Sequence, residues 1–203
     1  MSMLKYAGQA WLVLVVAVAS GAVLAALERQ LAPRIAANEK VARAGAAMKL
    51  IAGAARAEPL AVEWSADAGA QSAEMYRVLG GGGELLGWAV PAQGKGYSTE
   101  PIKLLIGLTR DAGAIVDYAV LSSNETPGLG SKIDRSSFRK AFAGKPAGAH
   151  FQAVKKAAGL AGDEVQAITG ATISSQAVCD ILYHQLAQTG LAAELARRSA
   201  AEQ

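Results

Sequence analysis

The sequence has little cysteine, few aromatic residues and no strong excess of charge of either sign, and each shortage excludes a class of protein. Its 203 residues include one cysteine, Cys179, so neither an intrachain disulfide nor a cysteine-ligated iron–sulfur cluster can form within the chain. Aromatic residues make up 5%, and the formal net charge is +3 with both signs interspersed. Because no basic stripe with interleaved aromatic residues is present, we expect no nucleic-acid partner.

Sequence motifs for nucleotide, metal and hydrolase sites are also missing. The glycine-rich segment 94–97 lacks the G-x-x-x-x-G-K-[ST] pattern of a P-loop. His150 and His184 are not spaced as metal ligands with each other or with Cys179, so no metal site is predicted. Nothing resembles the nucleophile elbow of a serine hydrolase. We therefore expect no stand-alone catalytic site.

Charge is absent from one long stretch near the N-terminus. The run from Tyr6 to Leu27 has 22 uncharged residues, and as a helix it would be about 33 Å long, enough to cross a bilayer core. Trp11 lies near one end, where interfacial aromatic residues are common. A cleaved signal peptide is the alternative, because Ala17-Val18-Ala19 is similar to a cleavage site and Lys5 precedes the run. Since the run continues well past that site, we expect a retained, single-pass anchor.

The pattern beyond this run predicts a helical connector and then a folded domain. Apolar residues near helical spacing, such as Ile35, Val41 and Met48, predict a helix from Glu28 to Arg56, which Glu58-Pro59 would end. The expected parts are a short N-terminus (1–5), a transmembrane helix (6–27), a helical connector (28–59), a folded domain (60–188) and a flexible tail (189–203).

Short strand patterns occur in pairs that predict hairpins. The runs Met75–Leu79 and Glu84–Val90 flank four consecutive glycines, and the runs Ile102–Leu108 and Ile115–Leu121 flank Asp111-Ala112-Gly113. Further predicted elements are a helix at Ser136–Phe142 capped by Ser136, a strand at Val165–Ile168 and a helix at Gln176–Leu186. Strands in hairpins with helices at the ends predict an α+β fold, in which one N-terminal transmembrane helix precedes a mostly antiparallel sheet with flanking helices.

The segment Thr169-Gly170-Ala171-Thr172 lies between the last strand pattern and the last helical pattern. The free N–H groups and the dipole at a helix start favour a phosphate there. A hydroxyl at such a place, without the lysine of a P-loop, indicates a phosphate held by a covalent bond. The plain alternative is that Thr172 caps the helix; otherwise Ser174 or Ser175 is the expected cap, with a hydroxyl that can also bond phosphate oxygens.

This segment resembles the flavinylation motif of the FMN-binding domain family, which occurs in the G subunit of the Rnf electron-transport complex and in the C subunit of the sodium-pumping NADH:quinone reductase. The segment 124–132 is similar to the family's E-T-P-G-L-G loop, and Gly96-Tyr97 is a third similar place. The resemblance implies that Thr172 carries FMN as a covalent phosphoester. Gln166 departs from the family pattern, which usually has aspartate there.

The resemblance also implies how the cofactor is held. The loop 125–132 would cover the isoalloxazine ring, with Leu129 on the ring face, Glu125 or Thr126 bonded to ring or ribityl groups, and Lys132 near the phosphate. Taken alone, Pro127-Gly128 indicates only a type II turn. Tyr97 and Trp88 are expected to be packing residues. The implied FMN-binding residues are Glu125, Thr126, Gly128, Leu129, Gly130, Lys132, Thr169, Gly170, Ala171, Ser174 and Ser175.

The implied function is electron transfer by a membrane flavoprotein. The chain would relay electrons through its FMN as one component of an ion-translocating oxidoreductase complex, with polytopic and iron–sulfur subunits as partners and a flavin transferase for maturation. The resemblance places the N-terminus in the cytoplasm and the flavin domain on the outer face of the cytoplasmic membrane. Charge does not favour this orientation, because Arg29, Arg34 and Arg43 follow the run. The alternatives are an FMN-binding redox sensor and a scaffold protein of the complex without flavin.

Overall fold

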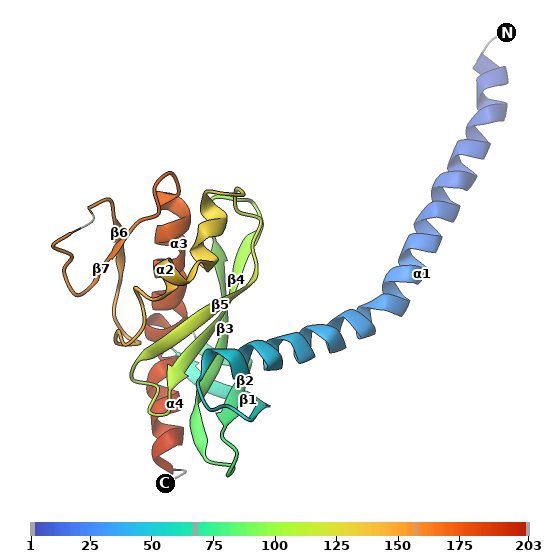
Figure 1. Cartoon of the computed structure of the whole chain (residues 1–203). Coiled ribbons are helices and arrows are strands. Elements are labelled where there is room, and N and C mark those ends of the chain that lie inside the picture. Colours follow the sequence, from blue (N-terminus) through green and yellow to red (C-terminus); the bar gives the residue numbers. More distant parts are fainter. Residues whose placement is uncertain (1–2, 67–68, 157, 202–203) are drawn as a thin grey trace. The chain divides into compact units, whose positions relative to one another are not determined.

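The computed structural model describes residues 3–66, 69–156 and 158–201 (Figure 1). Residues 1–2 of the expected N-terminus and residues 202–203 of the expected tail lie outside the described residues. The chain divides into two units, residues 1–42 and residues 43–203.

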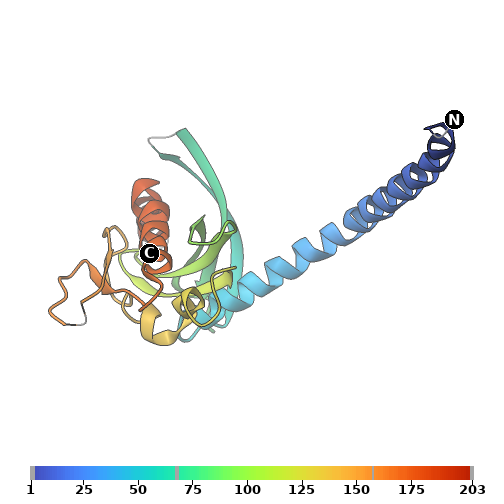
Figure 2. The ribbon, with the colours of Figure 1, turned by 90° about the horizontal axis from the view of Figure 1, so that it is seen from above.

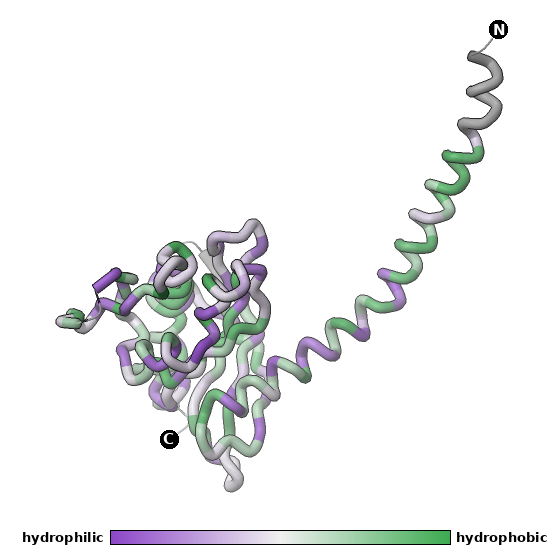
Figure 3. The backbone as a smooth tube through the Cα atoms, turned by 45° about the horizontal axis from the view of Figure 1, so that its top comes forward, coloured by the Kyte–Doolittle hydropathy of each residue, from purple (hydrophilic) through white to green (hydrophobic). Residues whose placement is uncertain are grey.

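Helix α1 (Met3–Leu50) has 48 residues and contains Pro33. Its part from Trp11 onward holds a window that is long and apolar enough to cross a membrane, and large side chains such as Leu14 and Leu24 are exposed there. Figure 3 shows the same hydrophobic stretch in the N-terminal half of α1. A signal sequence near an N-terminus has the same composition. The long apolar helix predicted from the sequence is present in the described residues.

Five antiparallel strands form the sheet in chain order, and the predicted α+β fold is confirmed. They are β1 (Arg56–Ala66), β2 (Gly69–Leu79), β3 (Leu85–Lys95), β4 (Pro101–Thr109) and β5 (Ile115–Ser122). Both predicted hairpins are present, β2–β3 and β4–β5. In the first turn, the N–H of Gly80 donates to the carbonyl of Glu84, and Gly83 has a φ of +86°, which glycine adopts without strain.

The prediction that the connector helix continues to Arg56 was wrong. Helix α1 ends at Leu50, and Gly53 follows with a φ of +82°, a conformation that a helix cannot continue. Residues 56–66 instead form the edge strand β1, in which Pro59 lies opposite Tyr76. Proline has no N–H to donate, and an edge strand tolerates it because one side of that strand pairs with no other strand. Burial of the alternate residues Val62 and Trp64 stabilises the strand. The strand was not predicted because the alanine-rich sequence around it does not show a clear strand pattern.

Each face of the sheet is covered by helix. Along β4, the even-numbered residues from Ile102 to Leu108 pack in one core with the C-terminal helices, while Leu105 packs on the opposite face against Leu50 and Ile51. Figure 2 shows the strands curving around the C-terminal helices. This alternation is what a strand buried on both faces requires.

The remaining elements connect the sheet to the last helices. They are a 3₁₀ turn η1 (Gly130–Asp134), α2 (Ser136–Arg139), the parallel pair β6 (Gln152–Val154) and β7 (Glu164–Gln166), α3 (Thr172–Tyr183), the π turn η2 (His184–Gln188) and α4 (Leu191–Ala201). The predicted strand at 165–168 is thus β7, one residue earlier at its start. The predicted cap of α2 was wrong, because Arg135 occupies the cap position and makes no side-chain cap bond.

The prediction of a flexible tail after residue 188 was also wrong. Leu191, Leu195 and Ser199 recur every four residues and are all buried, so α4 presents one continuous face to the core. The indole N–H of Trp88 donates to Ser199 Oγ at 2.9 Å and to the carbonyl of Arg110 at 3.1 Å. Trp88 is therefore a packing residue, as expected, and α4 is part of the domain.

Leu195→Ala is expected to destabilise the protein by about 2–4 kcal/mol, because it removes a fully buried side chain and leaves a cavity beside the sheet. Chemical denaturation followed by circular dichroism measures this change in the free energy of unfolding. Arg197→Ala on the exposed side of α4 is the matched control and should change it by less than about 1 kcal/mol. Equal, small effects of the two changes would mean that α4 does not pack against the core.

Two buried titratable groups contribute to packing in the core. Burial raises the pKa of the Cys179 thiol to about 12, so this thiol stays protonated at neutral pH. Burial also raises the pKa of Tyr118 well above its usual range, and its hydroxyl donates to the carbonyl of Ile133 at 2.6 Å. Both groups are neutral, hydrogen-bonded or packed parts of the core.

Candidate functional site

The start of α3 presents a hydroxyl and free backbone donors at the same place. Ala171 occupies the cap position, so Thr172 is the first residue of the helix and is not its cap. Within the described residues, neither the Thr172 hydroxyl nor the N–H groups of Thr172, Ile173 and Ser174 have a hydrogen-bond partner. Three unpaired N–H groups at the positive end of a helix dipole form a ready anion site.

The two serines after Thr172 face inward. Ser175 Oγ donates to the carbonyl of Ala171 at 2.8 Å and accepts from the N–H of Ile168 at 3.0 Å, which ties the turn to the helix. Ser174 Oγ donates to Glu125 Oε2 at 2.5 Å. The prediction that one of these serines caps α3 was wrong, since no side-chain cap bond is made. Their hydroxyls bond the protein, whereas the three backbone N–H groups and the Thr172 hydroxyl make no hydrogen bond in the described residues.

Glu125 joins three distant segments. Its Oε1 accepts from the N–H groups of Tyr97 at 2.9 Å and Ser98 at 3.1 Å, and its Oε2 accepts from Ser174. The residue is 4% exposed, so these three donors replace the water that the carboxylate gives up. The carboxylate thus fixes the segment after β3, the loop after β5 and the start of α3 relative to one another.

Two glycines make room for this carboxylate. A Cβ on Gly96 would overlap Glu125 Oε1, and a Cβ on Gly130 would lie 2.7 Å from Glu125 Oε2. Any side chain at either position would therefore displace Glu125. The Gly96-Tyr97 pair and the glycine of the loop, far apart in the sequence, serve the same contact.

Glu125→Ala is expected to cost about 3 kcal/mol or more of folding free energy, because it leaves three donors without their acceptor. Glu125→Gln keeps an acceptor oxygen and should cost roughly half as much or less. Glu100→Ala, at an exposed glutamate of the same region, is the control. Denaturation curves of the three variants measure their free energies of unfolding. A Glu125→Ala protein as stable as Glu100→Ala would contradict the role assigned to this carboxylate.

The segments joined by Glu125 enclose a cavity of about 590 Å³. It is lined by Tyr97, Thr126, Leu129, Gly130, Gly170, Ala171, Thr172, Ile173 and Ser174. The side chains of Tyr97, Ile173 and Leu129 are 68%, 57% and 42% exposed, so large apolar groups stand at the cavity with nothing covering them. Its volume lies in the range of pockets for small organic ligands and cofactors.

The positions of the predicted binding residues divide into two groups. The cavity is lined by the predicted residues Thr126, Leu129, Gly130, Gly170, Ala171, Thr172 and Ser174, but not by Glu125, Gly128, Lys132, Thr169 or Ser175. Tyr97 was predicted to be a packing residue and instead lies exposed at the cavity, and Ile173 was not predicted. Gly170 has a φ of +79°, and a Cβ there would lie 3.1 Å from Leu129, so the turn is built for glycine.

A second cavity, of about 380 Å³, also reaches Thr172. It is lined by Lys155, Ala167, Ile168, Thr169, Gly170 and Thr172. Lys155 lies here because β6 pairs with β7, and the N–H of Ala167 donates to the carbonyl of Val154 at 2.7 Å. Lys132, the cation expected near the phosphate, instead lines a separate cavity with Gln166 and Thr169. Lys155 thus shares a cavity with Thr172.

Comparisons with known proteins show what this region is similar to. Residues 96–187 match the family model described as the FMN-binding domain, a span that includes every residue of the 590 Å³ cavity. The G subunit of the proton-translocating ferredoxin:NAD(+) oxidoreductase complex of Clostridium ljungdahlii is 42% identical over 97 residues, covering 48% of this chain and 50% of that protein. The G subunit of the Na(+)-translocating complex of Acetobacterium woodii is 39% identical over 97 residues, covering 47% and 45%.

The chain spans about half the length of these curated relatives. Among solved structures, NqrC of Shewanella oneidensis has a similar fold, with a TM-score of 0.55 and 20% identity over 73% of this chain and 72% of that chain. The resemblance to the Rnf G subunit predicted from the sequence is confirmed by these relatives and by the match to the FMN-binding domain.

Proposed function

We propose that this relative of the G subunits of ion-translocating ferredoxin:NAD(+) oxidoreductase complexes holds one FMN, bound through its phosphate to the Thr172 hydroxyl, and relays electrons through it. The observation that carries the proposal is the position of Thr172. Its unpaired hydroxyl lies at the start of α3, beside three unpaired N–H groups and at the junction of two cavities within the matched domain.

The residues present fit FMN. The larger cavity has the volume for a flat ring system, and its exposed walls, Tyr97, Leu129 and Ile173, are apolar as a ring face requires. The N–H groups at the start of α3 suit a phosphate, which a phosphodiester to Thr172 keeps negatively charged. Lys155, in the adjoining cavity, supplies a positive charge on the same side of the turn. The apolar cavity that suits the ring and the polar groups that suit the phosphate therefore adjoin at Thr172, as an FMN esterified to this residue requires.

FMN, when bound, supplies the redox chemistry, since it accepts and donates one or two electrons. The protein's own residues bind and orient it. Leu129 and Tyr97 would border the ring while leaving part of it exposed, and Glu125 would hold their two segments in place from behind. A tethered but exposed ring suits a relay, because redox partners must approach it closely.

The chain would act within a membrane assembly. Helix α1 supplies one apolar span, and a single span offers no path for an ion, so ion transport would belong to polytopic partner subunits. Iron–sulfur subunits would supply or accept electrons, because the single cysteine cannot hold a cluster. We further propose a cytoplasmic N-terminus with the flavin domain on the outer face of the membrane. Maturation would use a flavin transferase that recognises the segment 169–172.

Leu129→Ala is expected to shift the flavin absorbance maxima and the reduction potential without preventing attachment, because it removes an apolar wall of the cavity but no group near the ester. Leu160→Ala is the matched control, since Leu160 is 40% exposed against 42% for Leu129 and lines a different cavity. Spectra and redox titrations of the flavinylated proteins make the comparison. A loss of attachment with unchanged spectra in the remaining flavin would reverse the proposed roles of the loop and the helix start.

A further inference from the structure

The sheet opens between β2 and β3. Their pairing extends from Leu79 opposite Leu85 only as far as Tyr76 opposite Ala89, although β2 begins at Gly69 and β3 continues to Lys95. No backbone bond joins residues 69–75 to residues 90–95 in the part of the chain that the structure describes. In this stretch both strands keep their outer partners, because β2 pairs with β1 and β3 pairs with β4.

Pro91 contributes to the opening. Continued in the same register, β2 and β3 would place Glu74 opposite Pro91, the second pair beyond the last one formed. A proline there has no N–H to donate, so the ladder loses a bond just where the strands separate. The two strands therefore present facing edges whose backbone groups have no partner strand.

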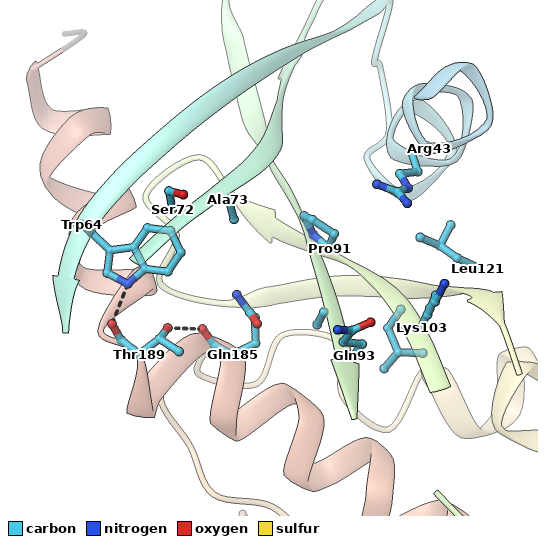
Figure 4. A pocket seen from close by; sticks show the side chains of 12 residues that line it. Arg43, Trp64, Ser72, Ala73, Pro91, Gln93, Lys103, Leu121, Gln185 and Thr189 are labelled. Carbon is cyan, nitrogen blue, oxygen red and sulfur yellow. Dashed lines mark hydrogen bonds between the residues drawn. The ribbon is translucent and has the colours of Figure 1, made fainter. Parts of the chain in front are cut away.

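The far end of the β1–β2 hairpin is tied to the C-terminal helices instead of to β3. The indole N–H of Trp64 donates to the carbonyl of Thr189 at 2.7 Å, and the Thr189 hydroxyl donates to the carbonyl of Gln185 at 2.6 Å (Figure 4). Arg198 donates to the carbonyl of Glu63 at 3.5 Å. These bonds hold the hairpin away from β3, so specific contacts within the domain maintain the gap between β2 and β3.

A cavity of about 330 Å³ occupies this gap. It is lined by Ser72 and Ala73 of β2, by Pro91, Ala92 and Gln93 of β3, and by residues of the neighbouring elements, among them Arg43, Lys103 and Gln185 (Figure 4). The lining includes Leu104 from one face of the sheet and Leu121 from the other, as expected where a sheet is parted.

The charged residues that line this cavity are all positive. Arg43 and Lys103 carry positive charge, and none of the twelve lining residues is acidic. Lys103 lies directly opposite Gln93 in the β3–β4 pair and makes no ion pair among the described residues. The side-chain amides of Gln93 and Gln185 likewise make no hydrogen bond there. The cavity thus combines open strand edges with cationic and amide groups.

We propose that this gap is a docking groove for an extended, acidic segment of a partner protein in the complex. The segment adds as a strand to the open edge of β3, at the usual spacing of about 4.8 Å, and places a carboxylate against Lys103. Unpaired strand edges are templates for pairing with another chain, and proteins normally cover them. The proposal does not rest on the flavin, because the groove and the 590 Å³ cavity share no residue.

Photo-crosslinking in native membranes tests the groove with the full-length chain. A benzophenone amino acid replaces Gln93, and the crosslinked peptide is identified by mass spectrometry. We expect a crosslink to one other protein of the complex, within a stretch that contains aspartate or glutamate. Lys103→Glu and Ser72→Trp, which reverse the charge and fill the cavity, should each reduce the crosslink at least several-fold. Lys140→Glu, at an exposed lysine outside the groove, should not.

Covalent flavin content, read from fluorescence on denaturing gels, shows whether each variant still folds and is modified. Unchanged flavin with a reduced crosslink supports the groove. A crosslink that persists in both groove variants, one that forms to a second copy of this chain or to lipid, or no crosslink at all would overturn the proposal. None of these outcomes depends on whether the FMN takes part in electron transfer.

Discussion

Thr172→Ala is expected to remove all covalently bound flavin from the chain. The hydroxyl of Thr172 has no partner in the described structure and stands at the three free N–H groups of α3, so it is the group available for a phosphoester. The fold should survive, because a partly exposed first-turn threonine contributes little to packing. Flavin fluorescence on denaturing gels and the intact mass of the purified chain measure the result.

Thr169→Ala is the matched control. Thr169 is exposed, precedes Thr172 by three residues and also makes no hydrogen bond in the described structure, yet it lies before the helix and outside the larger cavity. Thr169→Ala should keep its covalent flavin. A Thr172→Ala protein that retains covalent FMN, with Thr169→Ala losing it, would move the attachment to the other threonine.

The second large effect is expected in the assembled complex. With Thr172→Ala, the electron transfer that we propose for the assembled complex should fall to the level of membranes that lack this chain, while the complex still assembles. The reason is that the main core, which includes residues of β4, α3 and α4, contains none of the residues that line the 590 Å³ cavity. Turnover of isolated membranes and mild-detergent copurification of the other subunits give the two readings.

Thr172→Ser provides the control for this experiment, because it keeps a hydroxyl at the same position. The Thr172→Ser complex should retain covalent flavin, and its turnover should be proportional to its flavin content. An assembled Thr172→Ala complex that turns over as the wild type does would rule out the electron relay and leave a scaffold role for the chain.

Much of the fold follows from local patterns. The glycine-rich and Asp-Ala-Gly turns lie between apolar runs, so both hairpins could be predicted from neighbouring residues alone. A helix after the small residues of the turn was predicted from the same kind of signal, although α3 begins at Thr172, four residues before the predicted Gln176. These elements are specified within a few residues along the chain, which is the range over which sequence patterns are informative.

Strand β1 and helix α4 could not be predicted, because their stability comes from distant partners. Pro59 and the surrounding alanines favour no strand on their own, and β1 exists through its pairing with β2. The tail residues are rich in alanine and arginine, and α4 is fixed by its contacts with Trp88 and the core. Local propensity is weak evidence where tertiary packing decides.

The candidate site was predicted by its motifs but not by its geometry. The resemblance implied that Glu125 or Thr126 bonds the cofactor; Thr126 lines the cavity, whereas Glu125 does not and instead bonds Tyr97, Ser98 and Ser174. Lys155 belongs to no motif, and it lines a cavity with Thr172 because β6 pairs with β7. Which groups surround a site depends on contacts between segments far apart in sequence, and a local pattern does not record them.

Peptide mapping of the native protein shows directly whether Thr172 carries the flavin. Trypsin cleavage after Lys156 and Arg197 releases residues 157–197, which contain both threonines of the motif and both serines that follow it. We predict that this peptide carries the mass of one FMN less one water, and that fragmentation assigns the added mass to Thr172. An unmodified peptide from chain isolated out of its assembled complex, or a flavin assigned to Thr169, Ser174 or Ser175, would contradict it.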